Sequence, residues 1–355
     1  MLKPKLILYV SLILLLGQSC YAPNPKLSNA QPKASNAQLP NPASINIIHR
    51  FTIEYPSASA GVKRDNTWWI LGDDAATLLQ IPLPLNDTNI HQSQQVALPY
   101  FRETKGGINT RVPKKIKLDF EAMAHYRHPF LGDFIWAFGS GSKQAQRDSG
   151  IYWNLPIQEH NPTANAYKIN LGPLYEVLQR RSQISPEKWN IEGACIDYSQ
   201  EGALYLLNRL PATLIRIPLR DWFRYLEIGS IPHDKNIQIK TYTLPQIQGQ
   251  PSGFSGATYD SSRHSIWFSS SVEITDDPIR DGEILGSFIG EISLLSGEIN
   301  RTPMPVPEVP GVTQKTKLES LSIDLESNAK KRLFYGTVDN DNGGSQLLLI
   351  QIVFD

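Results

Sequence analysis

Cysteine is scarce in this sequence, which has two in 355 residues. Two cysteines exclude a small scaffold held together by several disulfides, and any zinc site built from four cysteine ligands. The seven histidines show no spacing typical of metal ligands either. Any metal site would therefore have to be built from oxygen ligands, which are the ligands of hard cations.

An excess of charge of either sign is also absent, because 34 Lys and Arg residues balance 34 Asp and Glu residues. Binding to nucleic acid usually needs a basic surface that neutralises phosphates. The sequence therefore predicts no nucleic-acid partner. With 41% hydrophobic and 19% charged residues, the chain has the composition of a protein with a substantial core.

The apolar run at the N-terminus, residues 6–16, is too short to span a bilayer, which needs roughly 20 residues. It follows Lys3 and Lys5 and precedes a small-residue site that ends in Cys20. This pattern predicts a signal peptide over residues 1–19. The ending resembles a bacterial lipobox, so we expect lipidation of Cys20 and an exported protein anchored in the cell envelope, which in a Gram-negative cell means the outer membrane or the periplasm. The alternative is cleavage after Ala22 and a soluble secreted protein.

Residues 20–45 are expected to form a disordered tether. They are mostly Pro, Asn, Ala, Ser and Gln, and the peptide Ser-Asn-Ala-Gln occurs at both 28–31 and 35–38. Such a segment has too few apolar residues to fold by itself. The sequence thus predicts one globular domain over residues 46–355, held off a membrane by a flexible segment.

A short pattern recurs five times in that domain. Each copy has an apolar or small residue, then Ser or Glu, then mostly small residues that lead into a β-type stretch. The Ser or Glu positions, called the repeat marks below, are Ser59, Glu121, Glu192, Ser255 and Glu319. Their spacings of 62, 71, 63 and 64 residues are similar. A polar turn, an aromatic second strand and further strands follow each mark, which predicts an all-β fold, the β-propeller, with one four-stranded sheet per blade.

Five blades are expected, and the N-terminal strand is expected to close the ring. The fifth copy ends after its third strand, and residues 47–55 read as the missing fourth one. Closure would remove an exposed sheet edge. Six blades are the alternative, if a degenerate blade lies in the longer second or third repeat, whose extra length looks helical at 174–181 and 221–226. The weaker fourth strands are expected at 111–117, 167–171, 237–244 and 299–304.

The first strand of a propeller blade lines the central channel, and the second returns to the same face. The marks and the ends of the second strands should therefore meet at one mouth of the channel. Three converging carboxylates would repel one another, so a cation, raised pKa values or neighbouring donors must compensate. Oxygen ligands favour Ca²⁺. Alternatively, each glutamate is architectural and accepts backbone N–H groups of the next loop.

These considerations define the candidate residues. The candidate catalytic residues are Glu121, Glu192, Glu319 and Arg209, and the three glutamates are also the candidate metal ligands. The candidate ligand-binding residues are Asp73, Asp74, Ser140, Ser142, Lys143, Ser255, Ser270, Asp339 and Asp341.

Several segments also resemble a known family. They are Leu-Asp-Phe-Glu-Ala at 118–122, Gly-Ser-Gly-Ser at 139–142, Asn-Ile-Glu-Gly at 190–193, and residues 275–287. Together they look like an uncharacterised family of bacterial propeller lipoproteins, which is similar, more remotely, to the secreted propellers known as phytase-like esterase domains. The resemblance covers about residues 47–355. It implies the propeller fold and no specific activity, because one fold hosts many functions.

Two functions remain open at this point. The first is a monomeric binding or scaffold protein that takes an unknown small molecule or protein at the channel mouth, with the marks as caps or as a structural calcium site. The second is a metal-dependent phosphoesterase or esterase, in which the cation polarises the ester and activates water. We expect few basic residues near the marks, which argues against a highly anionic substrate. The first function is favoured, because no acid–base pair has a supporting spacing.

Overall fold

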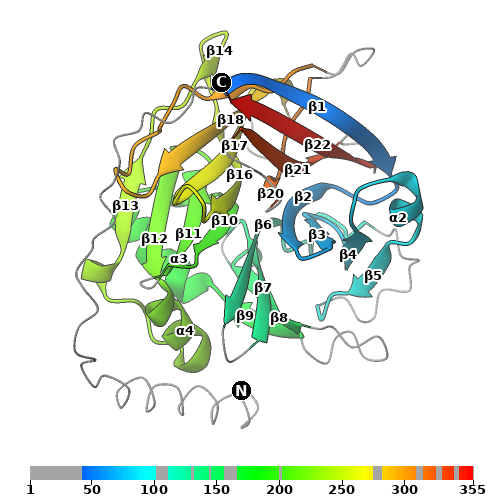
Figure 1. Ribbon diagram of the computed structural model, residues 1–355. Coiled ribbons are helices and arrows are strands. Elements are labelled where there is room, and N and C mark those ends of the chain that lie inside the picture. The colour runs from blue at the N-terminus through cyan, green and yellow to red at the C-terminus, as the bar shows by residue number, and fades with distance from the viewer. Residues whose placement is uncertain are drawn as a thin grey trace, which may run out of the picture.

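The computed structural model describes residues 42–355 except 101–110, 129–131, 144, 156–165, 200–201, 275–281, 309–314, 325–329, 340–343 and 355. In this part of the chain, five four-stranded antiparallel sheets surround a central channel (Figure 1). The predicted five-bladed β-propeller is confirmed, and the six-bladed alternative is wrong.

The strands follow one another from the channel outwards in every blade. Blade 1 is β2 (Ala58–Arg64), β3 (Thr67–Gly72), β4 (Thr77–Pro82) and β5 (Gln94–Ala97); blade 2 is β6 (Phe120–His128), β7 (Gly132–Gly139), β8 (Ser149–Leu155) and β9 (Ala166–Asn170). Blade 3 is β10 (Ile191–Asp197), β11 (Ala203–Asn208), β12 (Thr213–Pro218) and β13 (Gln238–Thr241); blade 4 is β16 (Gly253–Asp260), β17 (Ser265–Ile274), β18 (Glu283–Ser293) and β19 (Met304–Pro305). Blade 5 is β20 (Ser322–Ile323), β21 (Lys331–Asp339), β22 (Ser345–Phe354) and β1 (Pro42–Ile53).

The N-terminal strand closes the ring, as expected. β1 pairs antiparallel with β22, with Ile47 opposite Ile350, so blade 5 is built from both ends of the described chain (Figure 1). Ile45 and Ile47 pack against a cluster of buried residues from blades 4 and 5. β1 begins at Pro42, four residues before the expected start of the domain at 46.

The outermost strand of blade 1 differs from the prediction. It is β5, which pairs with β4, and not residues 111–117. Residues 113–117 instead form a turn in which Ile116 and Lys117 donate their N–H groups to the carbonyl of Pro113. An outer strand pairs on one side only and needs few apolar residues, so its pattern is weak; here Val96 alone is buried. Of the other three predicted outer strands, 167–171 and 237–244 coincide with β9 and β13, whereas 299–304 shares only Met304 with β19.

Helices occupy the extra length of the second and third repeats, as expected. They are α3 (Gly172–Ser182) and α4 (Leu219–Ile228), and Trp222 of α4 packs edge-on against Trp136 of β7 with ring centroids 5.9 Å apart. The remaining elements are the short helix α2 (Asp87–His91), two 3-10 turns (Pro186–Lys188 and Asp234–Asn236) and the hairpin of β14 (Gln246–Ile247) and β15 (Gln250–Pro251).

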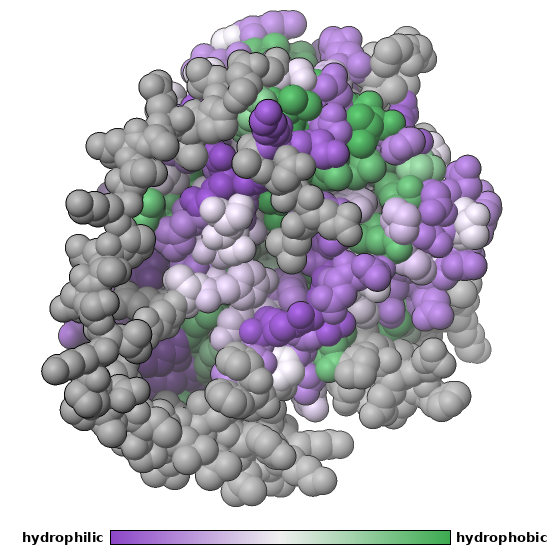
Figure 2. Space-filling view, viewed as in Figure 1, coloured by the Kyte–Doolittle hydropathy of each residue, from purple (hydrophilic) through white to green (hydrophobic). Residues whose placement is uncertain are grey.

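None of the helices in the described ranges combines the length and the hydrophobicity that a membrane span requires. On the face seen in Figure 2, hydrophilic side chains are interspersed with smaller groups of hydrophobic ones.

The repeat marks coincide with irregularities in strand pairing. In blades 1 to 4, the register between the first and second strands shifts by one residue at the mark, which leaves one residue unpaired. The unpaired residues are Ser59, Glu121, Glu192 and Ser255. A β-bulge of this kind re-aims its side chain and bends the strand. The polar residue of the repeat is therefore the one that leaves the sheet pattern at the channel mouth.

Candidate functional site

The structure brings the three glutamate marks to one mouth of the channel. Glu192 lies close enough to both Glu121 and Glu319 to act on their ionisation. We call this end the charged mouth. It comprises Asp73, Asp74, Arg111, Lys117, Asp119, Glu121, Arg147, Glu192, Arg209, Glu273, Lys317 and Glu319.

In blades 1 and 2, basic side chains alternate with carboxylates. The ammonium of Lys117 bonds to Asp73 and lies 2.8 Å from Asp119 Oδ1. The other oxygen of Asp119 accepts from Arg147, at 2.7 Å, and from Ser140 Oγ, at 2.5 Å. These contacts fasten the loop after β3 to the start of β6.

Ser142 and Asp74 also find partners on this side. Ser142 Oγ accepts from Arg147 at 2.7 Å. Asp74 Oδ2 accepts from Arg111 Nε at 2.6 Å. Predicted ligand-binding residues of blades 1 and 2 are thus held by neighbouring basic side chains.

A second chain of ion pairs links blades 3, 4 and 5. Arg209 donates to Glu192 at 2.8 Å and to Glu273 at 2.6 Å. Lys317 lies 2.9 Å from a carboxylate oxygen of Glu319 and 3.5 Å from one of Glu273. The negative charge that the glutamates bring is therefore compensated by cations of the chain itself.

The expectation of few basic residues near the marks is wrong. Sequence reasoning missed Lys117, Lys317, Asp119 and Glu273. A signal was present for the lysines, because Lys117 precedes its mark by four residues and Lys317 by two. No local signal pointed to Glu273, which reaches the mouth from the far part of the long strand β17.

Three carboxyl groups of the mouth hold their protons more tightly than usual. Burial, and then the charge of Asp119, raises the pKa of Glu121 well above its ordinary value. Burial raises the pKa of Glu319 to about 7, although Lys317 opposes the shift. Burial likewise raises the pKa of Asp73 to about 6 against the opposing effect of Lys117. Glu121 forms no hydrogen bond or ion pair with the residues that the structure describes.

These pKa values predict a pH-dependent contribution of Glu319 to stability. Its pKa is higher in the folded state than in the unfolded state, so its contribution is fully present below about pH 4.5 and is lost as the pH rises through 7. Comparing the wild type with Glu319→Gln isolates this group, since the opposite contribution of His125, whose pKa is lowered to about 4, cancels in the difference.

We expect the stability difference between the wild type and Glu319→Gln to shift by roughly 1–3 kcal/mol in favour of the variant between pH 5 and pH 8, because one pKa unit is worth about 1.4 kcal/mol. Urea unfolding at several pH values measures it. A difference that stays constant with pH would contradict the raised pKa.

The structure separates the three predicted metal ligands into two groups. Within the described ranges, the one set of three carboxylates whose oxygens all lie within 4.8 Å of one another is Asp73, Asp119 and Glu121. Glu192 and Glu319 lie outside this set and bind Arg209 and Lys317. The trio of Glu121, Glu192 and Glu319 therefore does not form a compact ligand set here.

The two serine marks join neighbouring blades. Ser59 Oγ donates to the carbonyl of Phe120 at 2.7 Å, which links blade 1 to blade 2. Ser255 Oγ donates to the carbonyl of Leu318 at 2.5 Å, which links blade 4 to blade 5. Both serines are buried, so the predicted ligand-binding role of Ser255 competes with an architectural one.

The remaining predicted residues are dispersed. Ser270 is fully buried on β17, and its hydroxyl has no partner within the described chain. Lys143 is exposed, and Asp339 at the end of β21 is near enough to Arg111 to act on its charge. Asp341 lies outside the described residues, as does Cys20.

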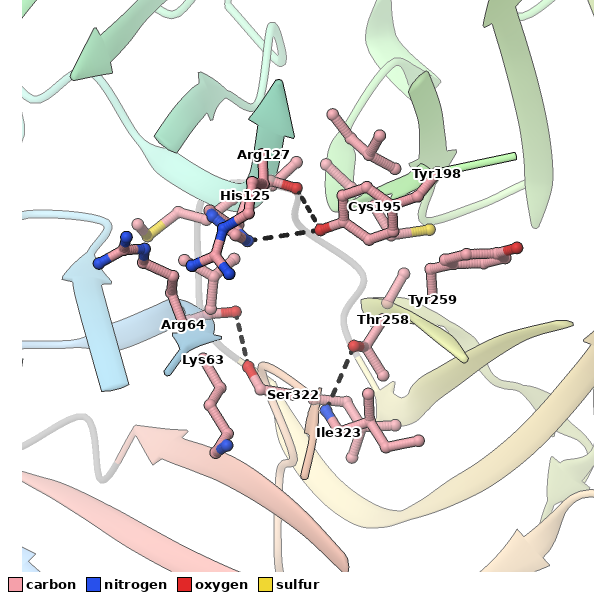
Figure 3. A pocket seen from close by; sticks show the side chains of 18 of the residues that line it. Lys63, Arg64, His125, Arg127, Cys195, Tyr198, Thr258, Tyr259, Ser322 and Ile323 are labelled. Atoms are coloured by element: carbon pink, nitrogen blue, oxygen red, sulfur yellow. Dashed lines mark hydrogen bonds between the residues drawn. The ribbon is translucent and has the colours of Figure 1, made fainter. Parts of the chain in front are cut away.

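A cavity of about 340 Å³ occupies the other part of the channel, beyond the marks (Figure 3). We call it the channel pocket. All five innermost strands or their flanks line it, beginning two residues after each mark. These first lining residues are Gly61, Met123, Ala194, Ala257 and Leu321.

The walls and the rim of the channel pocket differ in chemistry. The walls are mostly small or apolar, and small side chains such as Ala124 and Ala194 leave the space near the axis open. On the rim, basic groups from β2 and β6 face tyrosines of blades 3 and 4 (Figure 3). The rim residues are Lys63, Arg64, Asp65, His125, Arg127, Tyr198 and Tyr259.

Sequence reasoning did not single out the channel pocket, because it followed the marks to the opposite mouth. Three of the rim residues stand four positions after a repeat mark, namely Lys63, His125 and Tyr259.

The pocket offers binding groups and no activated nucleophile among its described residues. Burial lowers the pKa of His125 to about 4, so its imidazole is neutral at neutral pH. Burial raises the pKa of the Cys195 thiol well above its usual value, which leaves the thiol protonated and unreactive. The hydroxyl of Tyr198 donates to the carbonyl of His125 at 2.7 Å and closes the rim between blades 2 and 3.

Solved structures resemble this chain at low similarity. The tail fibre of Staphylococcus aureus phage P68 has a TM-score of 0.42 and 11% identity, over 88% of this chain and 53% of that one. A GH43 glycoside hydrolase engineered to display endo-xylanase and exo-arabinofuranosidase activity has a TM-score of 0.45 and 10% identity, over 85% and 51%. A luciferin-regenerating enzyme has a TM-score of 0.39 and 10% identity, over 88% and 95%.

This chain thus spans about half the length of the first two proteins. Similarities this low say nothing about its ligand or activity. No curated protein matches the sequence, and these matches do not bear on the expected phytase-like resemblance or lipid anchor. The profile of one protein family does match, over residues 54–352, which is nearly the whole propeller. The chain belongs to that family, a family of unknown function (DUF6929).

Proposed function

We propose that this protein is a binding protein that takes a small organic molecule into the channel pocket. The observation that carries the proposal is the cavity of about 340 Å³ on the propeller axis, to which every blade contributes. Its size falls within the range of small-molecule sites, roughly 300–1,000 Å³. Apolar walls with a few polar groups at the rim are also typical of such sites.

The charged mouth supports the same proposal, because most of its charged groups are already engaged with one another. Arg209 and Lys317 join glutamates of three blades, and Lys117 joins blades 1 and 2. This arrangement favours an architectural role for two of the glutamate marks, through ion pairs with Arg209 and Lys317 in place of the backbone N–H groups that were expected. The ion pairs of the charged mouth then hold neighbouring blades together, and the ligand binds in the opposite part of the channel.

A variant that fills the pocket tests the binding role. Thr258 lines the pocket and is half-buried, so Thr258→Phe places a ring in the cavity. We expect the neutral fluorescent probe N-phenyl-1-naphthylamine to bind the wild type, and its affinity to fall at least fivefold in the variant. The matched control is Thr52→Phe, on the exposed surface of β1, which should bind like the wild type.

The binding role would be contradicted if the probe bound Thr258→Phe as well as the wild type, or failed to bind the wild type. Melting curves of both variants show whether they are folded.

The alternative of a metal-dependent esterase depends on a cation at the charged mouth, where the donor set fits poorly. The Lys117 ammonium occupies the space between Asp73 and Asp119, so a divalent cation would first have to displace it. We therefore derive no catalytic step through calcium.

Millimolar calcium is accordingly expected to leave the melting temperature of metal-free protein unchanged. A bound cation would stabilise the native state by about 2.7 kcal/mol at a concentration one hundred times its dissociation constant. A calcium-induced rise that is lost in Glu121→Gln would overturn this expectation and favour the esterase.

The proposal for localisation rests on the sequence alone. The signal-like residues 1–19 and Cys20 support an exported protein held at a membrane by one lipid anchor, with the propeller as a monomer in the cell envelope. A ligand of the channel pocket would then come from outside the cytoplasm.

A further inference from the structure

The rim of the channel pocket presents more cationic than anionic side chains to the cavity. Three cationic side chains line the cavity, namely Lys63, Arg64 and Arg127, against one carboxylate, Asp65. The lining thus has a net charge of +2, from three positive groups and one negative group. His125 adds no charge at neutral pH, because burial lowers its pKa to about 4. With the carboxylates of Asp133 and Asp324 behind them the cluster as a whole is neutral, so a ligand at this rim meets cationic donors whose partners lie outside the lining.

The carboxylates that hold these cations do not line the cavity. Asp324 lies 3.2 Å from Lys63 and is 6% exposed. Asp133 binds Arg64 and Arg127 and is 8% exposed. Neither aspartate belongs to the pocket lining. Buried partners therefore fix the cations in place, which lowers the cost of ordering them around a ligand.

The guanidinium of Arg64 has donor groups that its protein partners do not fully engage. Its Nε is buried and has no hydrogen-bond partner in the described chain. Its Nη1 lies 3.3 Å from Asp65, whose side chain is 55% exposed. A solvent-exposed ion pair of this kind contributes little to stability. Asp65 also accepts from Arg127 Nη2 at 2.8 and 3.0 Å, so an oxyanion that takes its place meets both guanidinium groups and forms charge-assisted hydrogen bonds with them.

Away from the cationic side chains most of the lining is apolar, and the hydroxyls of Thr258 and Ser322 are engaged with backbone groups of Ile323 and Gly61. Val62, Met123, Ala124, Ile196 and Leu321 come from four of the five blades. These five side chains offer no partner to a second charge, so this part of the cavity suits a hydrocarbon or aromatic body.

Resting on the binding role proposed above, we propose that the ligand of the channel pocket is an amphipathic organic anion. Its head is an oxyanion, a carboxylate or a phosphate ester, bound at Lys63 and Arg64. Its body is apolar and lies along the channel axis.

A series of ligands with one body and different heads tests this class. Isothermal titration calorimetry of the full-length protein compares octanoate, octyl phosphate, 1-octanol and octylamine, with acetate as a head without a body. We expect both octyl anions to bind at least tenfold more tightly than 1-octanol, and octylamine and acetate not to bind. The ratio of the two anion affinities distinguishes a carboxylate ligand from a phosphate ester.

Two variants test whether the oxyanion head of the ligand binds at Arg64 and Lys63. Arg64→Gln keeps Asp133 paired through Arg127, so the fold should survive, and the affinity for the octyl anions should fall at least tenfold while that for 1-octanol stays unchanged. Lys63→Met combined with Asp324→Asn removes both members of a buried pair and should act likewise. The matched control is Arg220→Gln, a largely exposed arginine of α4 outside the pocket.

The outcomes separate the two proposals. If 1-octanol or octylamine binds as tightly as octanoate and is blocked by Thr258→Phe, the channel binds ligands and the anionic class is wrong. If the anions bind equally well to Arg64→Gln, the head site is wrong. If neither the anions nor N-phenyl-1-naphthylamine binds the wild type, both this inference and the binding role fail.

Discussion

Deletion of β1, residues 42–53, is expected to leave the protein unfolded or aggregated. β1 pairs with β22 from Pro42 opposite Phe354 to Ile53 opposite Ser345, and no other described strand pairs with that edge. Its loss would expose a long apolar strand with unpaired backbone groups, which is a template for aggregation. The lost pairing and burial exceed what a domain with a stability of about 5–15 kcal/mol can tolerate.

Circular dichroism and urea unfolding measure this effect. The matched control removes residues 21–41 and keeps β1, and it should unfold at the same urea concentration as the full-length chain. A β1-deleted protein that unfolds cooperatively at the wild-type midpoint would show that ring closure is dispensable.

The second large effect is expected for Arg209→Met. Arg209 bridges Glu192 and Glu273, and both carboxylate side chains are almost fully buried. Methionine keeps much of the side-chain volume and removes the charge. Leaving buried carboxylates without their cation costs about 3–5 kcal/mol. Lys317 remains near Glu273, and Asn190 remains bonded to Glu192, so we expect the lower part of that range.

The loss of stability in Arg209→Met should depend on pH, because a buried carboxylate without a cation can take up a proton. The unfolded state releases that proton more readily, so stability falls as the pH rises. We expect the destabilisation to be larger at pH 8 than at pH 5.5 in urea unfolding. The double variant Arg209→Met with Glu192→Gln should recover part of the loss at pH 8. A small loss of stability that does not vary with pH would show that these ion pairs do not hold the blades together.

The exposed Arg220 provides the control for charge removal as such. Arg220→Met removes one positive charge from the surface of α4 and is expected to change stability by less than about 0.5 kcal/mol. A comparable loss in both variants would point to net charge as the cause.

The repeat pattern predicted correctly where the marks lie, but it did not predict what each mark binds. The spacing of Ser59, Glu121, Glu192 and Ser255 predicted one mouth of a channel, and the structure places a bulge at each. Whether a mark caps a blade or joins an ion pair depends on what the neighbouring blade presents. Ser255 meets a carbonyl of blade 5, whereas Glu192 meets Arg209.

The sequence by itself determined the fold class, the number of blades and the closing strand. Each of these follows from local information, namely the alternation along a strand, the turn residues, and a spacing repeated five times. Two of the four weak outer strands, β9 and β13, were also found, and a third was found at one residue. The one that was misplaced, at 111–117, failed because an outer strand buries few side chains and leaves little pattern.

Only the tertiary structure decided which charges meet and where the channel stays open. Arg209 and Glu273 are 64 positions apart along the chain and bond at 2.6 Å. Lys63 and Asp324 lie at opposite ends of the propeller sequence and meet because the ring closes. Strand periodicity specifies which face a side chain takes, but the distance between blades depends on how all five pack. The channel pocket is the space that this packing leaves on the axis, so no single repeat could reveal it.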